Sequence, residues 1–184
     1  MTNERETYGI DIAGIHRELE LFEVKPGLRI AILNILGDTE LVEACAIALY
    51  KKLEGIDFDV LVTAEAKSIP LAHALSVATG KKYVILRKSY KPYMGDALKS
   101  ETLSITTGQP QTLYLDEKDR VLLKDRLVVI VDDVISTGST LQGMRMILEK
   151  ANAHIAAEAA ILTEGERAKW ADIHALGHLP VFTD

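Results

Sequence analysis

The sequence is poor in the features that mark secreted and membrane proteins. It has a single cysteine, Cys45, in 184 residues, so no internal disulfide can form. No apolar run approaches the roughly 20 residues that a membrane-spanning helix needs. The first residues, Met-Thr-Asn-Glu-Arg-Glu, are charged, unlike a secretory signal. These absences exclude a disulfide-stapled fold and predict a cytoplasmic protein with no membrane partner.

Linkers, repeats and low-complexity segments are also missing, because no stretch is rich in proline, glycine or serine. With 48% apolar and 26% charged residues, the chain can bury one α/β core, which predicts a single domain over residues 1–184. The formal charge of −6 disfavours a nucleic-acid partner, although it leaves room for cations around a phosphate site.

The most informative segment lies between Val128 and Thr140. Residues 127–131 are all apolar, which predicts a strand buried on both faces. Asp132 and Asp133 follow at once, so we expect both carboxylates at the carboxyl end of a central parallel strand, where ligands of open α/β sheets bind. A short loop then leads into an amphipathic helix that begins near Thr140. The loop consists of Ser136, Thr137, Gly138, Ser139 and Thr140.

This arrangement favours a pentose 5-phosphate as the ligand. The loop amides and the positive end of the helix suit a phosphate, and Gly138 permits a tight turn. The carboxylates of Asp132 and Asp133 accept hydrogen bonds, so they suit the vicinal hydroxyls of a ribose, or a magnesium ion. The loop lacks the lysine of a Walker motif and the spaced glycines of a dinucleotide fingerprint. The alternative is an ordinary strand–turn–helix corner with an acidic surface.

Residues 128–140 resemble the phosphoribosyl pyrophosphate (PRPP) motif of type I phosphoribosyltransferases. The shared pattern is a hydrophobic run, an acidic pair, two apolar residues and a small-Thr-Gly-small-Thr loop. The resemblance implies an α/β fold with a central, mostly parallel sheet flanked by helices, a flexible flap and a small hood. It also implies that Asp132 and Asp133 hold the ribose hydroxyls and that residues 136–140 hold the 5-phosphate. Mg²⁺ would accompany PRPP, with the same aspartates as candidate ligands, and the protein would be a homodimer.

A second loop follows another predicted strand. Residues 58–64 are largely apolar, and Pro70 opens a predicted helix. The loop between them is similar to the turn of adenine-type family members, whose equivalent segment grips the pyrophosphate of PRPP. The alternative is a short connection with a solvated lysine. The loop comprises Glu65, Ala66, Lys67 and Ser68.

Two adjacent cations, Arg87 and Lys88, follow the strand predicted at 83–86. A guanidinium there can bind two pyrophosphate oxygens at once. By itself, such a pair is more often a solvated surface feature. The similar Arg-Lys pair of the family contacts pyrophosphate, so the resemblance makes Arg87 a catalytic candidate beside Asp132 and Asp133.

Residues 89–115 lack sustained periodicity and predict a flap, with short strands near 103–105 and 113–115. A lid is expected because phosphoribosyl transfer passes through an oxocarbenium-like state that water would capture. Type I members resemble this chain in having a mobile flap at this place.

The flap departs from the family in one position. Adenine-type relatives have a candidate acid/base glutamate in a Leu-Glu-Tyr-Gly stretch, where this chain has Ile-Thr-Thr-Gly at 105–108. Thr106 cannot act as a general base. Glu101 and Asp96 are candidate substitutes on the same flap.

The terminal segments, about 1–36 and 177–184, have alternating apolar residues and predict either a hood over the base, as in the family, or edge strands that complete the sheet. A helix capped by Asp38 or Thr39 follows the first of them. Aromatic residues for stacking on the base could not be assigned. Phe22, Tyr8 and Tyr114 are equally plausible as core residues.

The base must match the donors and acceptors of the site. A 6-oxopurine calls for a donor, commonly a lysine just after the strand predicted at 154–162, whereas adenine calls for an acceptor. Residues 157–165 contain no lysine. Lys169 could reach back, but Glu164 better suits adenine.

The sequence therefore predicts transfer of 5-phosphoribosyl from PRPP to a purine, with adenine favoured, giving AMP and pyrophosphate. Three alternatives stay open. One is a 6-oxopurine transferase, another is an orotate or other pyrimidine transferase, and the third is a PRPP-binding regulator without catalysis.

Overall fold

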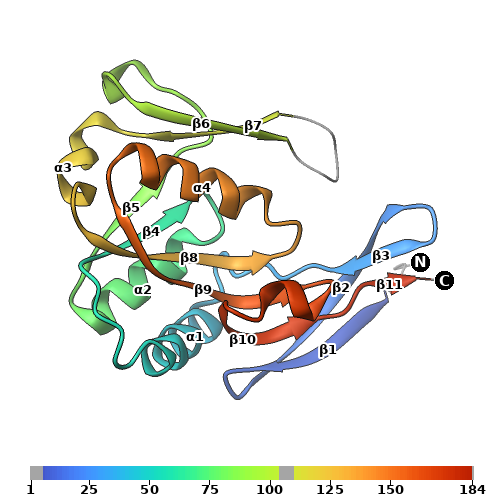
Figure 1. The fold of residues 1–184 in the computed structure, drawn as a ribbon. Helices are drawn as coiled ribbons and strands as arrows, with labels where there is room; N and C mark the ends of the chain where they lie inside the picture. Colours follow the sequence, from blue (N-terminus) through green and yellow to red (C-terminus); the bar gives the residue numbers. More distant parts are fainter. Residues whose placement is uncertain (1–5, 104–109, 184) are drawn as a thin grey trace.

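Five parallel strands form the central sheet of the computed structural model, which describes residues 6–103 and 110–183 (Figure 1). The strand order is β10-β9-β8-β4-β5, and every neighbouring pair is parallel. This confirms the predicted α/β class with a mostly parallel sheet. The strands are β4 (Val60–Ala64), β5 (Lys82–Leu86), β8 (Leu127–Ile135), β9 (His154–Glu164) and β10 (His174–Leu179).

Helices cover both faces of this sheet. Side chains alternate along β8, so that Val129 and Val131 pack in one core with α1 and α2, whereas Val128 and Ile130 pack in a second core with α4. All four side chains are fully buried, as predicted for a strand covered on both faces. The helices are α1 (Thr39–Lys52), α2 (Ile69–Thr79), α3 (Arg120–Leu123) and α4 (Ser139–Lys150). None in the described part of the chain is long and apolar enough to cross a membrane.

Local sequence signals explain where the helices begin and end. Asp38 caps α1, because its side chain accepts a hydrogen bond from the amide of Leu41 at 3.2 Å. Gly80 ends α2 with a left-handed φ of 68°, as predicted. Helix α2 begins at Ile69, one residue before Pro70, which lies in its first turn where a missing amide hydrogen costs little.

Two strand ends differ from the sequence prediction. Strand β8 continues through Asp132 and Asp133 to Ile135, because residues beyond the acidic pair still bond to β9. Strand β9 likewise continues past Leu162 to Glu164, which pairs with Leu179 of β10. The two carboxylates are therefore held within a strand rather than in a loop.

Segments near the two ends of the described chain form a separate antiparallel sheet, the hood, of order β1-β2-β3-β11 (Figure 1). Hood residues Ile12, Leu19 and Ala31 are buried in the same core as α1. Residues 177–179, predicted to join either the hood or an edge of the main sheet, belong to the edge strand β10, because they pair with β9. The hood strands are β1 (Thr7–Ile12), β2 (Ile15–Lys25), β3 (Leu28–Ala31) and β11 (Phe182–Thr183).

The flap is a two-stranded hairpin of β6 (Leu98–Leu103) and β7 (Pro110–Leu115) that lies over α4 (Figure 1). Leu113 and Leu115 are buried against the α4 side of the core. The first strand begins earlier than predicted, and Thr106 lies outside the described residues. Three short 3-10 helices, η1 (Pro92–Met94), η2 (Glu117–Asp119) and η3 (Arg167–Trp170), complete the described elements.

Candidate functional site

The acidic pair lies at the carboxyl end of the sheet, beside the loop that joins β4 to α2. Ser68 Oγ is 2.6 Å from Asp132 Oδ1 and 3.0 Å from Asp133 Oδ1, and all three residues are buried. The amide of Asp133 donates to Ser68 Oγ at 3.0 Å and to Asp132 Oδ1 at 2.9 Å. A hydroxyl has one hydrogen, so Ser68 can donate to only one carboxylate at a time. The pair therefore keeps spare acceptor capacity for a ligand.

Burial makes the charged form of this pair costly. Desolvation raises the pKa of Asp132, the neighbouring Asp133 raises it further, and the hydrogen bond from Ser68 opposes the shift. Strongly perturbed carboxyl groups of this kind concentrate at functional sites. A cation or a pair of ribose hydroxyls would relieve the penalty.

Lys67 lies next to the acidic pair, on the side of Asp133. Its Nζ is 3.7 Å from Asp133 Oδ2 and donates to the carbonyl of Leu33 at 3.2 Å. The ammonium therefore offsets part of the negative charge of the acidic pair. Its assignment to the pyrophosphate stays a prediction.

The loop from Ser136 to Thr140 forms a small polar cup at the start of α4. Gly138 has a left-handed φ of 80°, which only glycine adopts without strain. A Cβ at this position would stand 2.8 Å from the indole ring of Trp170, which packs on the loop. The cavity inside the cup measures about 30 Å³ and is lined by Asp132, Val134, Ile135, Ser136, Thr137, Gly138, Ser139, Thr140 and Leu141. Its size and donors suit a single phosphate group.

Three of the predicted pyrophosphate residues, Glu65, Arg87 and Lys88, form one hydrogen-bonded group. Arg87 Nε donates to Glu65 Oε2 at 2.5 Å, and the amide of Lys88 donates to Glu65 Oε1 at 2.6 Å. Hydrogen bonds to Glu65 and Tyr93 raise the pKa of Arg87. Glu65 thus orients Arg87 with its carboxylate, while the pyrophosphate role of the loop, including Ala66, stays a prediction.

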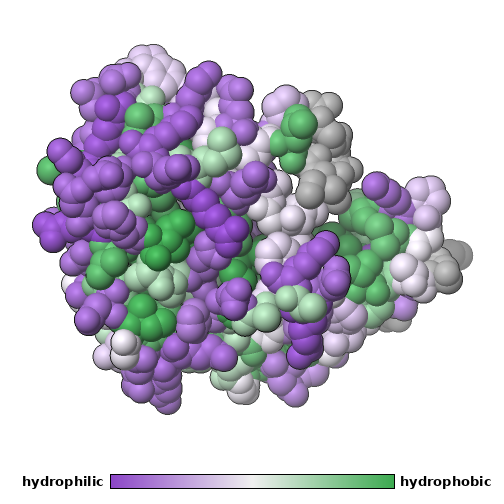
Figure 2. All heavy atoms as spheres, viewed as in Figure 1, coloured by the Kyte–Doolittle hydropathy of each residue, from purple (hydrophilic) through white to green (hydrophobic). Residues whose placement is uncertain are grey.

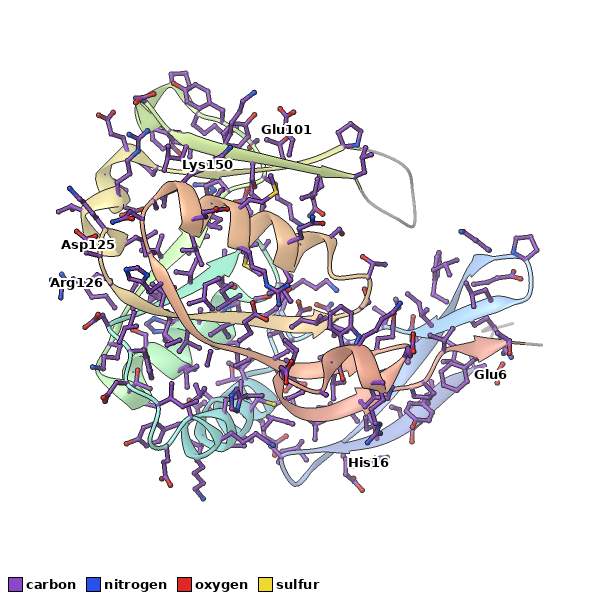
Figure 3. All side chains as sticks on the ribbon, viewed as in Figure 1. Glu6, His16, Glu101, Asp125, Arg126 and Lys150 are labelled. Carbon is purple, nitrogen blue, oxygen red and sulfur yellow. The ribbon has the colours of Figure 1, made fainter. Side chains whose placement is uncertain are left out.

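The two flap acids are engaged in surface ion pairs. Glu101 pairs with Lys99 at 3.1 Å, and Asp96 pairs with Arg120 at 3.2 Å. Figure 3 shows Glu101 on the outer side of the hairpin, pointing away from α4. The geometry therefore adds nothing to the hypothesis that either acid replaces the family glutamate.

A larger pocket of about 610 Å³ lies between the hood and the segment after β9. Trp170 lines this pocket but was not predicted, since a tryptophan in a short helix far from the motifs gives no local sequence signal. Of the three aromatic candidates, Phe22 lines the pocket, whereas Tyr8 packs on Phe182 and Tyr114 on Tyr90. Figure 2 shows hydrophobic side chains gathered on the hood at the right of the molecule. The lining residues are Phe22, Val24, Lys25, Leu28, Ile30, Ser136, Thr137, Glu164, Gly165, Glu166, Lys169, Trp170 and Val181.

The donor set suits Mg²⁺ only in part. Among the residues that the structure describes, no group of three or more His, Cys, Asp or Glu side chains could hold a metal ion. Asp132 and Asp133 offer carboxylate oxygens, and Mg²⁺ is usually bound by one or two carboxylates together with substrate phosphates. These residues therefore fit a metal that arrives with a polyphosphate.

A small polar cup, a buried acidic pair and an adjoining pocket lie together at the carboxyl end of the parallel sheet, and their groups suit a phosphorylated sugar. Residues 32–178 match the model of the phosphoribosyl transferase domain, and the chain belongs to this family.

Relatives found by sequence and relatives found by structure differ in the base that their names carry. The chain is 38% identical to a hypoxanthine/guanine phosphoribosyltransferase of Methanothermococcus okinawensis over 62% of this chain and 58% of that protein. It is 35% identical to one of Methanotorris igneus over 71% of this chain and 67% of that protein. A solved adenine phosphoribosyltransferase of Thermoanaerobacter pseudethanolicus has a TM-score of 0.67 and 22% identity, covering 94% and 95% of the two chains. The likeness to the solved structure shows the fold alone. The sequence match to the Methanothermococcus okinawensis protein spans less than two thirds of that protein's length.

Proposed function

We propose that this chain is a purine phosphoribosyltransferase, which transfers the 5-phosphoribosyl group of PRPP to a purine ring nitrogen and releases pyrophosphate. One observation carries the proposal. The phosphate cup and the 610 Å³ pocket share Ser136 and Thr137, so a 5-phosphate in the cup places a ribose between the acidic pair and the pocket. A base in the pocket then lies next to the ribose to which it becomes attached.

Catalysis in this arrangement comes from positioning and charge. The loop 136–140 holds the phosphate, and Asp132 and Asp133 hold the ribose hydroxyls and face the positive charge that develops on the ring. Arg87, oriented by Glu65, stabilises the departing pyrophosphate. Mg²⁺, where bound with PRPP, adds further charge stabilisation to the leaving group. The cytoplasmic location and the homodimer remain predictions.

The pocket supports adenine as the base. Glu164 lies in the pocket wall at the end of β9, and burial raises the pKa of its carboxyl. Its oxygens can accept from an exocyclic amino group, which adenine has and hypoxanthine lacks. A 6-oxopurine is the second candidate, because Lys169 lines the same pocket and the archaeal relatives are named for hypoxanthine and guanine. The Lys169 ammonium, however, is exposed and lies 3.5 Å from Glu166.

The test is a product assay with one base at a time. The protein is incubated with PRPP, Mg²⁺ and adenine, hypoxanthine, guanine, xanthine or orotate, and any nucleotide is identified by mass. We expect AMP. Formation of IMP or GMP alone would make the second candidate correct. PRPP binding without product from any base would contradict the enzyme and favour a regulator.

Matched substitutions in the pocket identify the group that recognises the base. Glu164→Met removes the acceptor at similar length, and we expect kcat/KM for adenine to fall about 10-fold to 100-fold, because an unpaired polar group costs roughly 1–3 kcal/mol. Lys169→Met removes the donor in the same way and is expected to have a much smaller effect. Initial rates with each base give the comparison. A large loss for Lys169→Met with little change for Glu164→Met would reverse the assignment.

A further inference from the structure

Among the described residues, the flap is hydrogen-bonded to the phosphate loop through one side chain, that of Gln111. This residue follows Pro110 at the start of β7, and its side chain is half-buried. Its Nε2 donates to Thr140 Oγ1 at 3.2 Å, and its Oε1 lies 3.4 Å from Thr140 Oγ1 and 3.5 Å from Ser139 Oγ. These contacts join residues that are 28 and 29 positions apart in the sequence.

The contacts use the same hydroxyl groups that a phosphate would use. Ser139 and Thr140 line the 30 Å³ cup, and their hydroxyls can each donate to one acceptor, for which Ser139 also has Thr137 Oγ1 at 3.2 Å. Gln111 Oε1 lies within reach of both. A phosphate in the cup offers stronger, charged acceptors, so the hydroxyls would turn to it. The amide Nε2 is then left as a donor beside an anion.

The hairpin also reaches the other end of the site. The backbone of Tyr114, three residues after Gln111, exchanges two hydrogen bonds with Arg87, each of 2.8 Å. Ser100 Oγ donates to the carbonyl of Gly143 in α4 at 2.8 Å, and Leu113 packs against the same glycine. Strand β7 therefore links the group predicted to hold pyrophosphate to the loop predicted to hold the 5-phosphate.

We propose that Gln111 is a positioning residue that couples the flap to occupancy of the phosphate cup. In the free protein its amide satisfies the loop hydroxyls, and with a phosphorylated ribose bound its Nε2 donates to the phosphate and holds the flap over the site. The expected changes in KM rest on the proposed function. The expected change in ribose 5-phosphate binding requires only that a phosphate binds in the cup.

The test is Gln111→Glu, with Gln142→Glu as the matched control. Gln142 lies on α4 and is exposed, so the control adds the same charge near the loop without the contact. A carboxylate at position 111 would still accept from the hydroxyls but would repel a phosphate dianion. We expect KM for PRPP to rise about 10-fold, which corresponds to about 1.4 kcal/mol, with KM for the base nearly unchanged. In the reverse reaction, KM for the nucleotide should rise and KM for pyrophosphate should not.

Ligand binding without turnover separates this inference from the proposed function. Ribose 5-phosphate should raise the Tm of the unmodified protein and of Gln142→Glu, but raise that of Gln111→Glu much less. This result supports the inference even if no base gives a product. Equal effects of the two glutamate variants, or an unchanged response of Gln111→Glu, would overturn it. If Gln111→Glu does not fold, Gln111→Leu tests the same contact without a charge, and unchanged ribose 5-phosphate binding in that variant overturns the inference as well.

Discussion

Replacing both Asp132 and Asp133 by asparagine is expected to abolish phosphoribosyl transfer in a protein that still folds. Asparagine keeps the shape of each side chain and the oxygens that accept from Ser68 and from the amide of Asp133. It removes the negative charge beside the ribose ring, where positive charge develops. Losing one preorganised electrostatic group typically costs about 100-fold to 1,000-fold, so we expect a fall in kcat of about 1,000-fold or more when both are replaced. Near-normal turnover of the double variant would exclude the acidic pair from the site.

The single change Asp132→Asn is expected to raise stability, and the gain should depend on pH. Burial and Asp133 raise the pKa of Asp132. At a pH between the ordinary carboxyl pKa and this raised pKa, Asp132 is therefore protonated in the folded protein and ionised in the unfolded chain. Stability therefore falls as pH rises from the ordinary carboxyl range through the raised pKa, and asparagine removes this loss. Thermal unfolding with a chelator, from about pH 5 to about pH 8, should show a Tm difference between variant and unmodified protein that grows with pH. A difference that shrinks over this range would contradict the assigned direction.

The second large effect is expected from Gly138→Ala. The left-handed backbone at this position costs an alanine roughly 1–2 kcal/mol, and the added Cβ also meets the ring of Trp170. Both problems lie in the loop that forms the phosphate cup. We expect a lower Tm and at least about a 10-fold rise in KM for PRPP, which corresponds to about 1.4 kcal/mol. Steady-state kinetics and thermal unfolding measure the two effects.

Two controls divide the effect of Gly138→Ala between its causes. Gly80→Ala has a similar left-handed φ of 68°, but its Cβ would meet nothing within 4 Å, and it ends α2 away from the cup. It should lower the Tm with no change in KM for PRPP. Adding Trp170→Leu to Gly138→Ala, with Trp170→Leu alone as reference, should restore part of the PRPP affinity if the clash with the ring matters. A Gly138→Ala protein that binds PRPP normally would show that this loop does not hold the phosphate.

The strands and helix ends of the main sheet were predicted correctly where local sequence alone determines them. Residues 128–131 are apolar and buried. Asp38 begins α1 by capping it with its side chain, and Gly80 ends α2 because a residue without a side chain adopts the left-handed φ easily. The hood was harder to predict, because alternating strands near the termini could equally have extended the main sheet. The first three strands form two consecutive antiparallel hairpins, so they pair with one another in a separate sheet rather than with the main sheet. Strand β8 ran past the acidic pair because pairing with β9 outweighed the cost of burying two carboxylates.

Residues that are neighbours in one short segment could be predicted to lie together from the order of amino acids alone. The acidic pair and the phosphate loop are such a segment, because backbone geometry brings neighbours in the chain to one place. Contacts between distant segments could not be identified in this way, since they depend on how the elements pack. Ser68 reaches Asp132 across 64 positions, Gln111 reaches Thr140 across 29, and Trp170 covers Gly138 from a helix after β9. The local sequence therefore determined the acidic pair and the loop beside it. The packing of distant elements decided which side chains contact them and what shape the adjoining pocket has.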